Sequence, residues 1–210
     1  NAWIIIHLLK DKFGWSVNEP GFIFNLSVGY DLKGIQSQKV TWFFKKMLDA
    51  SDEISNKVNL ISSIYPRIKD ISIPSRISDN ITLSTMHGCP PHEIEAIASY
   101  LMKELKLHTA VKLNPTLLGA DKLRTILNET LGYPVIIPEE SFEHDLKYDE
   151  AILLINKLTQ TSKENNVEFG LKLTNTLETI NSTDFLPSKE KKVYLSGRAL
   201  HPISVNLAAQ

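Results

Sequence analysis

Two lysines stand inside apolar runs, and their amines are the groups in this chain best suited to chemistry. Lys112 lies in residues 109–113 (TAVKL), and Lys172 lies in residues 167–173 (VEFGLKL). Because a buried ammonium is costly unless an anion pairs with it or it loses its proton, a lysine in such a run needs a reason. It could hold an anionic cofactor or intermediate, or form a Schiff base with a carbonyl substrate. There are two structural alternatives. The lysine could form an ion pair with a carboxylate, or its aliphatic side chain could lie along the apolar surface and place the ammonium in water at the strand end.

Small polar residues, proline and glycine gather where the expected strands end. Residues 84–89 (STMHGC) follow one apolar run, residues 112–119 (KLNPTLLG) end a second, and residues 174–176 (TNT) end a third. In parallel α/β folds the binding and catalytic residues collect at the carboxyl ends of strands. We therefore expect the site at these stretches.

The elements that must position these residues follow from periodicity. A strand at 81–84, a helix at 90–105 that starts at a double proline, and a strand at 109–113 form a strand–helix–strand unit, which pairs its strands in parallel. Further strands are expected near residues 22, 135, 168 and 193. Further helices are expected at 3–13, 37–48, 52–63, 121–131, 151–161 and from Pro202 onward.

Three other segments carry expectations that the structure can test. Phe43 and Phe44 belong to an apolar helix face and predict core packing. The acidic residues 139–149 predict a solvated loop, and the polar residues 178–192 predict a mobile excursion from the fold.

Alternating helices and strands fit a doubly wound sheet or a barrel. The sequence has neither GxGxxG nor GxxxxGK[ST] after a strand, and polar ends on many successive strands favour the α/β class of the (β/α)8 TIM barrel. Such a barrel typically needs about 250 residues, so 210 residues predict an incomplete one. Because the chain starts at Asn1 rather than Met, we expect residues 1–210 to be a single domain, cut from a larger multidomain protein or processed.

The composition argues against several classes of binding partner and of metal site. The formal charge of −1 supplies no positive field for nucleic acid or for an anionic membrane. The lone Cys89 excludes an internal disulfide, as well as an all-cysteine metal or iron–sulfur site built from this chain alone. A reducing, cytoplasmic compartment fits, since no apolar run approaches the roughly 20 residues of a membrane helix and no signal peptide is evident.

Four motifs, in their order along the chain, carry a family resemblance. Residues 112–119 (KLNPTLLG), 172–176 (KLTNT) and 196–208 (SGRALHPISVNLA) resemble the FMN-binding barrel of the dihydroorotate and dihydropyrimidine dehydrogenases. Together with residues 84–95 (STMHGCPPHEIE), they are more similar still to proteins named selenate reductase, large iron–sulfur subunit, which contain such a barrel. The resemblance runs from residue 22 (FIFNLSVGYDLKGI) onward.

The resemblance implies an FMN over the barrel mouth, with a strand-end lysine near the pyrimidine edge of the flavin. Lys112 is preferred because Pro115 follows it as in the relatives, while Lys172 also fits the motif and is the second cofactor-binding lysine. Further implied site residues are Ser196 and Gly197 in a turn near the flavin, and Asn114, Asn175 and Thr176 holding a planar small-molecule substrate.

Two departures from the relatives matter. Where dihydroorotate-type relatives have Asn-Leu-Ser-Cys-Pro, this chain has residues 82–86 (TLSTM) and so loses the asparagine. Cys89 could replace the catalytic acid, because a thiol at a helix N-terminus is expected to have a depressed pKa; the alternative is a small side chain that packs the turn. In addition, the glycine-rich FMN-phosphate loops of the relatives have no counterpart in residues 1–210.

The resulting functional prediction is a flavin-dependent oxidoreductase domain. It would pass electrons between FMN, a small substrate and iron–sulfur clusters, with FAD or NAD(P) as optional further cofactors, and these additional groups would lie in other domains or subunits. Nothing in these residues selects selenate over a pyrimidine-like ring. Two alternatives stay open, a non-catalytic scaffold barrel and a Schiff-base lyase that uses Lys112 or Lys172.

Overall fold

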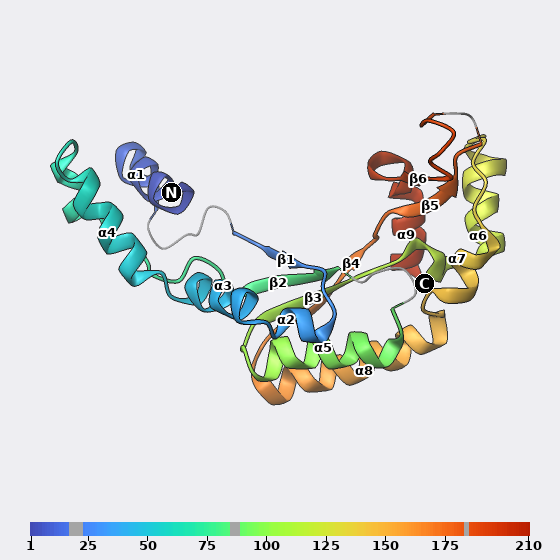
Figure 1. Cartoon of the computed structure of the whole chain (residues 1–210), viewed down its shortest axis with the longest axis horizontal. Coiled ribbons are helices and arrows are strands. Elements are labelled where there is room, and N and C mark those ends of the chain that lie inside the picture. The colour runs from blue at the N-terminus through green and yellow to red at the C-terminus, as the bar shows by residue number, and fades with distance from the viewer. Residues whose placement is uncertain (17–22, 85–88, 183–184) are drawn as a thin grey trace. The chain divides into compact units, whose positions relative to one another are not determined.

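The computed structural model describes residues 1–16, 23–84, 89–182 and 185–210 (Figure 1). Contacts within the chain group it into two compact units. Unit 1 comprises residues 1–26 and 33–80, and unit 2 comprises residues 27–32 and 81–210. Whether both belong to one domain stays a prediction.

Unit 1 is helical in its described part. It contains α1 (Ala2–Phe13), α3 (Gln38–Leu48), α4 (Ser51–Ile61) and the 3₁₀-helix η1 (Pro66–Asp70), while the short α2 (Leu32–Ile35) precedes α3. The helices expected at 3–13, 37–48 and 52–63 are confirmed. Gly14 ends α1 because its left-handed backbone, with a φ of 65°, turns its N–H back to the carbonyls of Lys10 and Asp11.

The predicted apolar face of α3 is only partly buried in the core. Phe44 is 2% exposed, as expected, but Phe43 is 45% exposed, so the prediction that both rings pack in the core is wrong. Successive helix residues point about 100° apart, since a turn holds 3.6 residues, and one face cannot bury both neighbours equally.

Unit 2 is built on a four-stranded sheet with the strand order β1-β2-β3-β4. Its strands are β1 (Leu26–Val28), β2 (Asn80–Ser84), β3 (His108–Leu113) and β4 (Phe169–Leu173). The spatial order follows the sequence order, and β3 and β4 pair in parallel. The α/β class and the strands expected near residues 81, 109 and 168 are thereby confirmed; β1 begins later than the expected run, whose residues 21 and 22 lie outside the described residues.

Two long helices cover one face of this sheet (Figure 1). They are α5 (Pro91–Lys103), which leads from β2 to β3, and α8 (Tyr148–Asn165), which leads into β4 and packs on α5. The predicted apolar face of α5 is confirmed, because its buried residues are Ile94, Ile97, Ala98, Leu101 and Met102. Asn166 ends α8 in a left-handed conformation, with a φ of 54°, at the predicted turn.

Strand β3 shows the two faces of the sheet. Thr109, Val111 and Leu113 are buried, whereas the alternating residues His108, Ala110 and Lys112 are only half-buried. Since successive side chains of a strand point to opposite faces, the second set lies on the opposite face from the first.

Three short helical segments follow β3 along the chain. They are the 3₁₀-helix η2 (Pro115–Leu118), then α6 (Ala120–Arg124), which continues as a π-helix (Thr125–Thr130), and α7 (Glu139–His144). The strand expected at 135–137 is wrong: this segment has no regular structure, and prolines at 134 and 138 offer no N–H to a ladder. The solvated loop expected at 139–149 is also wrong, since α7 forms there and Ser141 and Asp145 are buried.

A two-stranded antiparallel sheet follows β4. Strands β5 (Leu177–Ile180) and β6 (Lys192–Leu195) pair with Leu177 opposite Leu195, and the 3₁₀-helix η4 (Gly197–Leu200) and α9 (His201–Ala209) complete the chain. The mobile excursion expected at 178–192 is wrong over its ends, because Glu178 and Thr179 are buried in strand β5. The polar residues Glu178 and Thr179 interrupt the apolar run by which a buried strand is predicted, so β5 was not expected.

Charged groups hold the hairpin to α7. The Lys192 ammonium lies 2.7 Å from both Glu178 and Glu140, and the Tyr194 hydroxyl donates to Glu178 over 3.2 Å. Its hydrogen bonds to Glu140 and Glu178 raise the pKa of Lys192, and the same lysine lowers the pKa of Glu140. These ion pairs therefore anchor the hairpin through Lys192, which lies at the loop end of its two strands.

We predict that Lys192→Met lowers the Tm by a few degrees at neutral pH, because the largely buried Glu178 loses its cation. The pKa of Glu140 is depressed in the fold, so its part of this stability is present above the unfolded pKa of about 4.3 and is lost as pH falls through the folded value. Thermal unfolding of both proteins from pH 3 to pH 8 should show the Tm difference shrinking toward acid.

Lys189→Met is the matched control, since Lys189 is highly exposed and reaches Glu190 only at 4.0 Å. It should leave the Tm unchanged. A Tm loss in Lys192→Met that is the same at pH 3 and pH 7 would contradict the ion-pair explanation.

Candidate functional site

The predicted lysines are neighbours across the β3–β4 pair. Lys112 is the register partner of Lys172 in this parallel ladder. Registered residues project from the same face of a sheet, and adjacent strands lie about 4.8 Å apart. The sequence left open which lysine faces a ligand, and the structure places both side by side.

The lysines are not buried as their apolar surroundings predicted. Lys112 is half-buried and Lys172 is exposed, although Val111 and Leu113, which flank Lys112, are 1% and 4% exposed. The prediction of burial is wrong because the apolar neighbours occupy one face of the sheet and the lysines occupy the other. The period-two alternation of strand residues, applied to residues 109–113, would have placed Lys112 on the face opposite Val111 and Leu113.

The register places two cationic side chains next to each other on this face. Like charges that lie opposite each other on adjacent strands repel and destabilise the pair. An anionic group placed against both ammonium groups would relieve that repulsion. The face is therefore suited to binding an anion at the carboxyl end of the sheet.

The predicted substrate-binding residues lie just beyond the same two strands. The Asn175 N–H donates to the Leu113 carbonyl over 2.7 Å, which ties the end of β4 to the end of β3. Asn114 is 7% exposed and starts η2, while Asn175 is half-buried and its Oδ1 accepts the Thr176 N–H over 3.0 Å. Thus Asn114, Asn175 and Thr176 come from neighbouring strand ends, as a shared site requires.

A buried polar contact steadies the loop that carries Asn114. Thr116 Oγ1, in η2, donates to Asp145 Oδ2 over 2.7 Å, and both residues are buried. A hydrogen bond in a buried setting is electrostatically stronger than one in water. It links the β3 loop to the segment between α7 and α8, and neither residue was singled out by the sequence.

An open cavity of about 440 Å³ joins the end of β4 to the turn before α9. Its lining is formed by Leu173, Thr174, Gly197, Arg198, Leu200, His201 and Ser204. Gly197 has a φ of 66°, a backbone conformation that glycine adopts without strain, so the predicted tight turn at Ser196 and Gly197 is confirmed. Ser196 itself is exposed. Arg198 and His201 also line the cavity and were not among the predicted site residues, although both belong to residues 196–202 (SGRALHP).

Cys89 lies near the carboxyl end of β2 and is a free thiol. It is half-buried in a small hollow that Ser84, Tyr30 and Glu93 also line, and its Sγ lies 4.0 Å from Glu93 Oε2. Burial, and then the Glu93 carboxylate, raise the pKa of Cys89. The predicted depression is wrong, because burial and the Glu93 carboxylate both favour the protonated thiol. The thiol keeps its proton at neutral pH, and its role as an acid stays a prediction; residues 85–88 lie outside the described residues.

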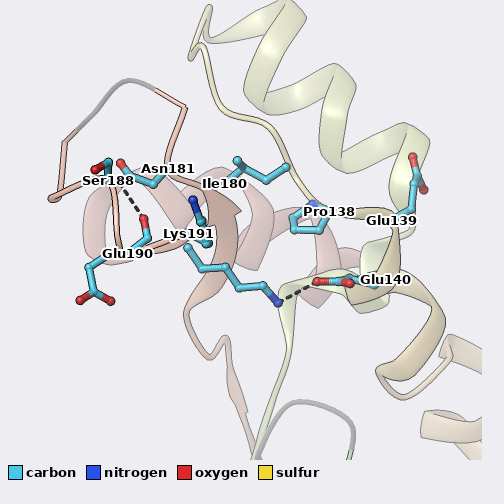
Figure 2. Close-up of a pocket in the computed structure, with 9 residues that line it drawn as sticks. Pro138, Glu139, Glu140, Ile180, Asn181, Ser188, Glu190 and Lys191 are labelled. Atoms are coloured by element: carbon cyan, nitrogen blue, oxygen red, sulfur yellow. Dashed lines mark hydrogen bonds and ion pairs between the residues drawn. The ribbon is translucent and has the colours of Figure 1, made fainter.

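A second open cavity, of about 670 Å³, lies beside the hairpin (Figure 2). Glu139, Glu140 and Glu190 line it together with Lys191 and Lys192, and the ion pair of Glu140 is drawn there as a dashed line. Its described lining includes none of the residues that the sequence predicts for the site. Its charges are mixed and already paired in part, so it is a less selective site for an anion.

Among the described residues, no group of three or more His, Cys, Asp or Glu side chains could hold a metal ion. No helix among them is long and apolar enough to cross a membrane.

The comparisons with known proteins agree with this architecture. A family model described as "Oxidoreductase YgfK, N-terminal TIM-barrel domain" matches residues 1–210. The "Putative oxidoreductase YgfK" of Escherichia coli strain K12 is 44% identical over 228 aligned residues, which cover 99% of this chain and 22% of that protein, and the protein of the same name from E. coli O157:H7 matches equally. The chain thus spans about a fifth of the length of these curated relatives. No solved structure matches it.

The predicted TIM-barrel class is confirmed by this family and by the parallel, sequentially ordered sheet. An oxidoreductase relationship is likewise confirmed. The narrower identification with selenate reductases and with flavin-dependent dehydrogenases stays a prediction.

We predict that Cys89 reacts with iodoacetamide more slowly at pH 7.5 than an unperturbed thiol, and that the midpoint of its rate against pH lies above the pKa of an unperturbed thiol, about 8.5, because burial and the Glu93 carboxylate raise the pKa of Cys89. Glu93→Gln removes the neighbouring negative charge and should shift the midpoint to lower pH. Glu104→Gln, at the other end of α5, is the control and should not change it. A midpoint below pH 8.5 in the unmodified chain would contradict the assignment.

Proposed function

The chain belongs to the family of YgfK oxidoreductase N-terminal TIM-barrel domains, and from this premise we propose that it supplies the flavin-facing part of an oxidoreductase site. Lys112 and Lys172 would lie against a bound FMN, with the turn at Ser196 and Gly197 beside it. Asn114, Asn175 and Thr176 would hold a small substrate.

The observation on which the proposal rests is the in-register pair of lysines on β3 and β4, on the face opposite the buried Val111 and Leu113. Bound FMN supplies two-electron and one-electron transfer. A flavin that takes up electrons gains negative charge, which preorganised cations stabilise. The residues fit this group, since two adjacent ammonium groups favour an anion and the ends of both strands add amide side chains.

The other residues of the site would orient the substrate and supply a proton. Asn114 and Asn175 each carry donor and acceptor atoms, which suits a planar ring with alternating polar edges. Cys89, with its raised pKa, retains a proton that it could donate to a substrate. Both roles use strand ends at the carboxyl edge of the same sheet.

For the complete protein, we propose that electrons pass between FMN, the substrate and iron–sulfur clusters in other domains or subunits, with FAD or NAD(P) as optional further cofactors. A cytoplasmic location is part of this proposal, because a reduced thiol and iron–sulfur clusters suit a reducing compartment. Selenate is one substrate class within it. The Schiff-base alternative calls for a desolvated amine, whereas Lys172 is exposed and Lys112 half-buried.

We predict that the full-length protein purifies with bound flavin and that Lys112→Ala and Lys172→Ala each weaken FMN binding roughly 10- to 100-fold, the range expected for a charge-assisted contact. The ratio of absorbance at 450 nm to that at 280 nm measures the retained flavin. Lys103→Ala, at the exposed end of α5, is the control and should remain yellow.

A colourless full-length protein would favour the scaffold alternative. Covalent trapping of a carbonyl substrate on Lys112 or Lys172 by borohydride would favour the lyase instead. Either result would overturn the flavin proposal.

We also predict that residues 1–210 alone bind FMN no more tightly than the micromolar range. The phosphate dianion of FMN needs several donors, and the phosphate loops of the resembling dehydrogenases have no counterpart in this sequence. Contacts to the ring alone leave little affinity after the loss of rigid-body freedom. Isothermal titration of FMN into the chain measures this, and submicromolar binding would show that the flavin site was assigned to the wrong residues.

A further inference from the structure

The cavity between the end of β4 and the start of α9 has a lining suited to one kind of ligand. Arg198 carries a permanent positive charge with five N–H donors in a planar fork. His201 adds an imidazole, and Thr174 and Ser204 add hydroxyl groups whose oxygens lie 3.5 Å apart. The lining identified among the described residues includes no carboxylate, so its net charge is positive.

From this lining we infer that the cavity is a binding site for a small oxyanion, a phosphate, sulfate or carboxylate group. An arginine fork matches the geometry of such groups and binds them through paired hydrogen bonds. Hydroxyl groups donate to the remaining oxygens. The volume of about 440 Å³ lies within the range of small-molecule sites.

The cavity is lined by residues that belong to, or directly adjoin, the proposed flavin site. Thr174 directly precedes Asn175, and Gly197 belongs to the turn predicted to lie near the flavin. The inference therefore deepens the proposed function, on which it rests for the identity of the ligand: the oxyanion is either the phosphate of the flavin nucleotide or an anionic group of the substrate. The binding of an oxyanion as such needs no flavin.

The test is the titration of inorganic phosphate into the 210-residue chain. Isothermal titration at constant ionic strength, with chloride as the reference anion, should show saturable phosphate binding, and Arg198→Gln should weaken it at least tenfold. Arg198→Lys keeps the charge without the fork and should recover part of the affinity. Arg76→Gln, which removes an exposed arginine of unit 1, is the matched control and should bind like the unmodified chain.

Competition identifies the source of the oxyanion. If FMN displaces phosphate and riboflavin does not, the site takes the cofactor phosphate; if phosphate binds alongside FMN, the site takes an anionic substrate. Absence of saturable phosphate binding, or equal binding by Arg198→Gln and Arg76→Gln, would overturn the inference.

The experiments distinguish failure of the oxyanion site from failure of the flavin proposal. Arg198-dependent phosphate binding in a chain whose full-length protein carries no flavin would support the oxyanion site and refute the flavin proposal alone. Since Arg198 is exposed, its replacement should not unfold the chain, which circular dichroism checks.

Discussion

The parallel, in-register pairing of β3 with β4 is the constraint on which the candidate site depends. It fixes Val111 and Leu113 on the buried face that α5 and α8 cover, and it thereby fixes Lys112 and Lys172 on the other. A shift of one residue in either strand would move that lysine to the helix-covered face, because side chains alternate with a period of two. The burial of apolar neighbours thus holds the two cations together.

A second constraint comes from the hairpin that interrupts the strand–helix alternation. Leu177 pairs with Leu195, so the residues just outside this pair, Thr176 and Ser196, leave the same end of the two-stranded sheet. The hairpin therefore brings two predicted site stretches together although they are 20 positions apart in the chain. Its anchor is Lys192, which lies between Glu178 and Glu140, so residues outside the site determine how its parts are placed.

The sequence predicted those features that a local pattern encodes. The apolar spacing in α5, the glycine stop of α1 and the strand ends near residues 113 and 173 are set by neighbours in sequence, and they were found. Strand β5 was missed because its Glu178 is buried against Lys192 and Tyr194, partners that only the fold supplies. The pKa of Cys89 was assigned the wrong direction for a related reason, since burial cannot be read from position at a helix N-terminus.

The exposure of the lysines carries a further physical consequence. In a closed barrel, of the type that this family forms, the face of the strands opposite the helices looks into a packed interior. Closure around Lys112 and Lys172 would remove both side chains from bulk water, and a bound anion would lower the cost of that desolvation. A ligand that binds only the closed form stabilises it by mass action. Under the flavin proposal, binding of the anionic cofactor and completion of the barrel favour each other, so the affinity would also depend on segments that do not touch the cofactor.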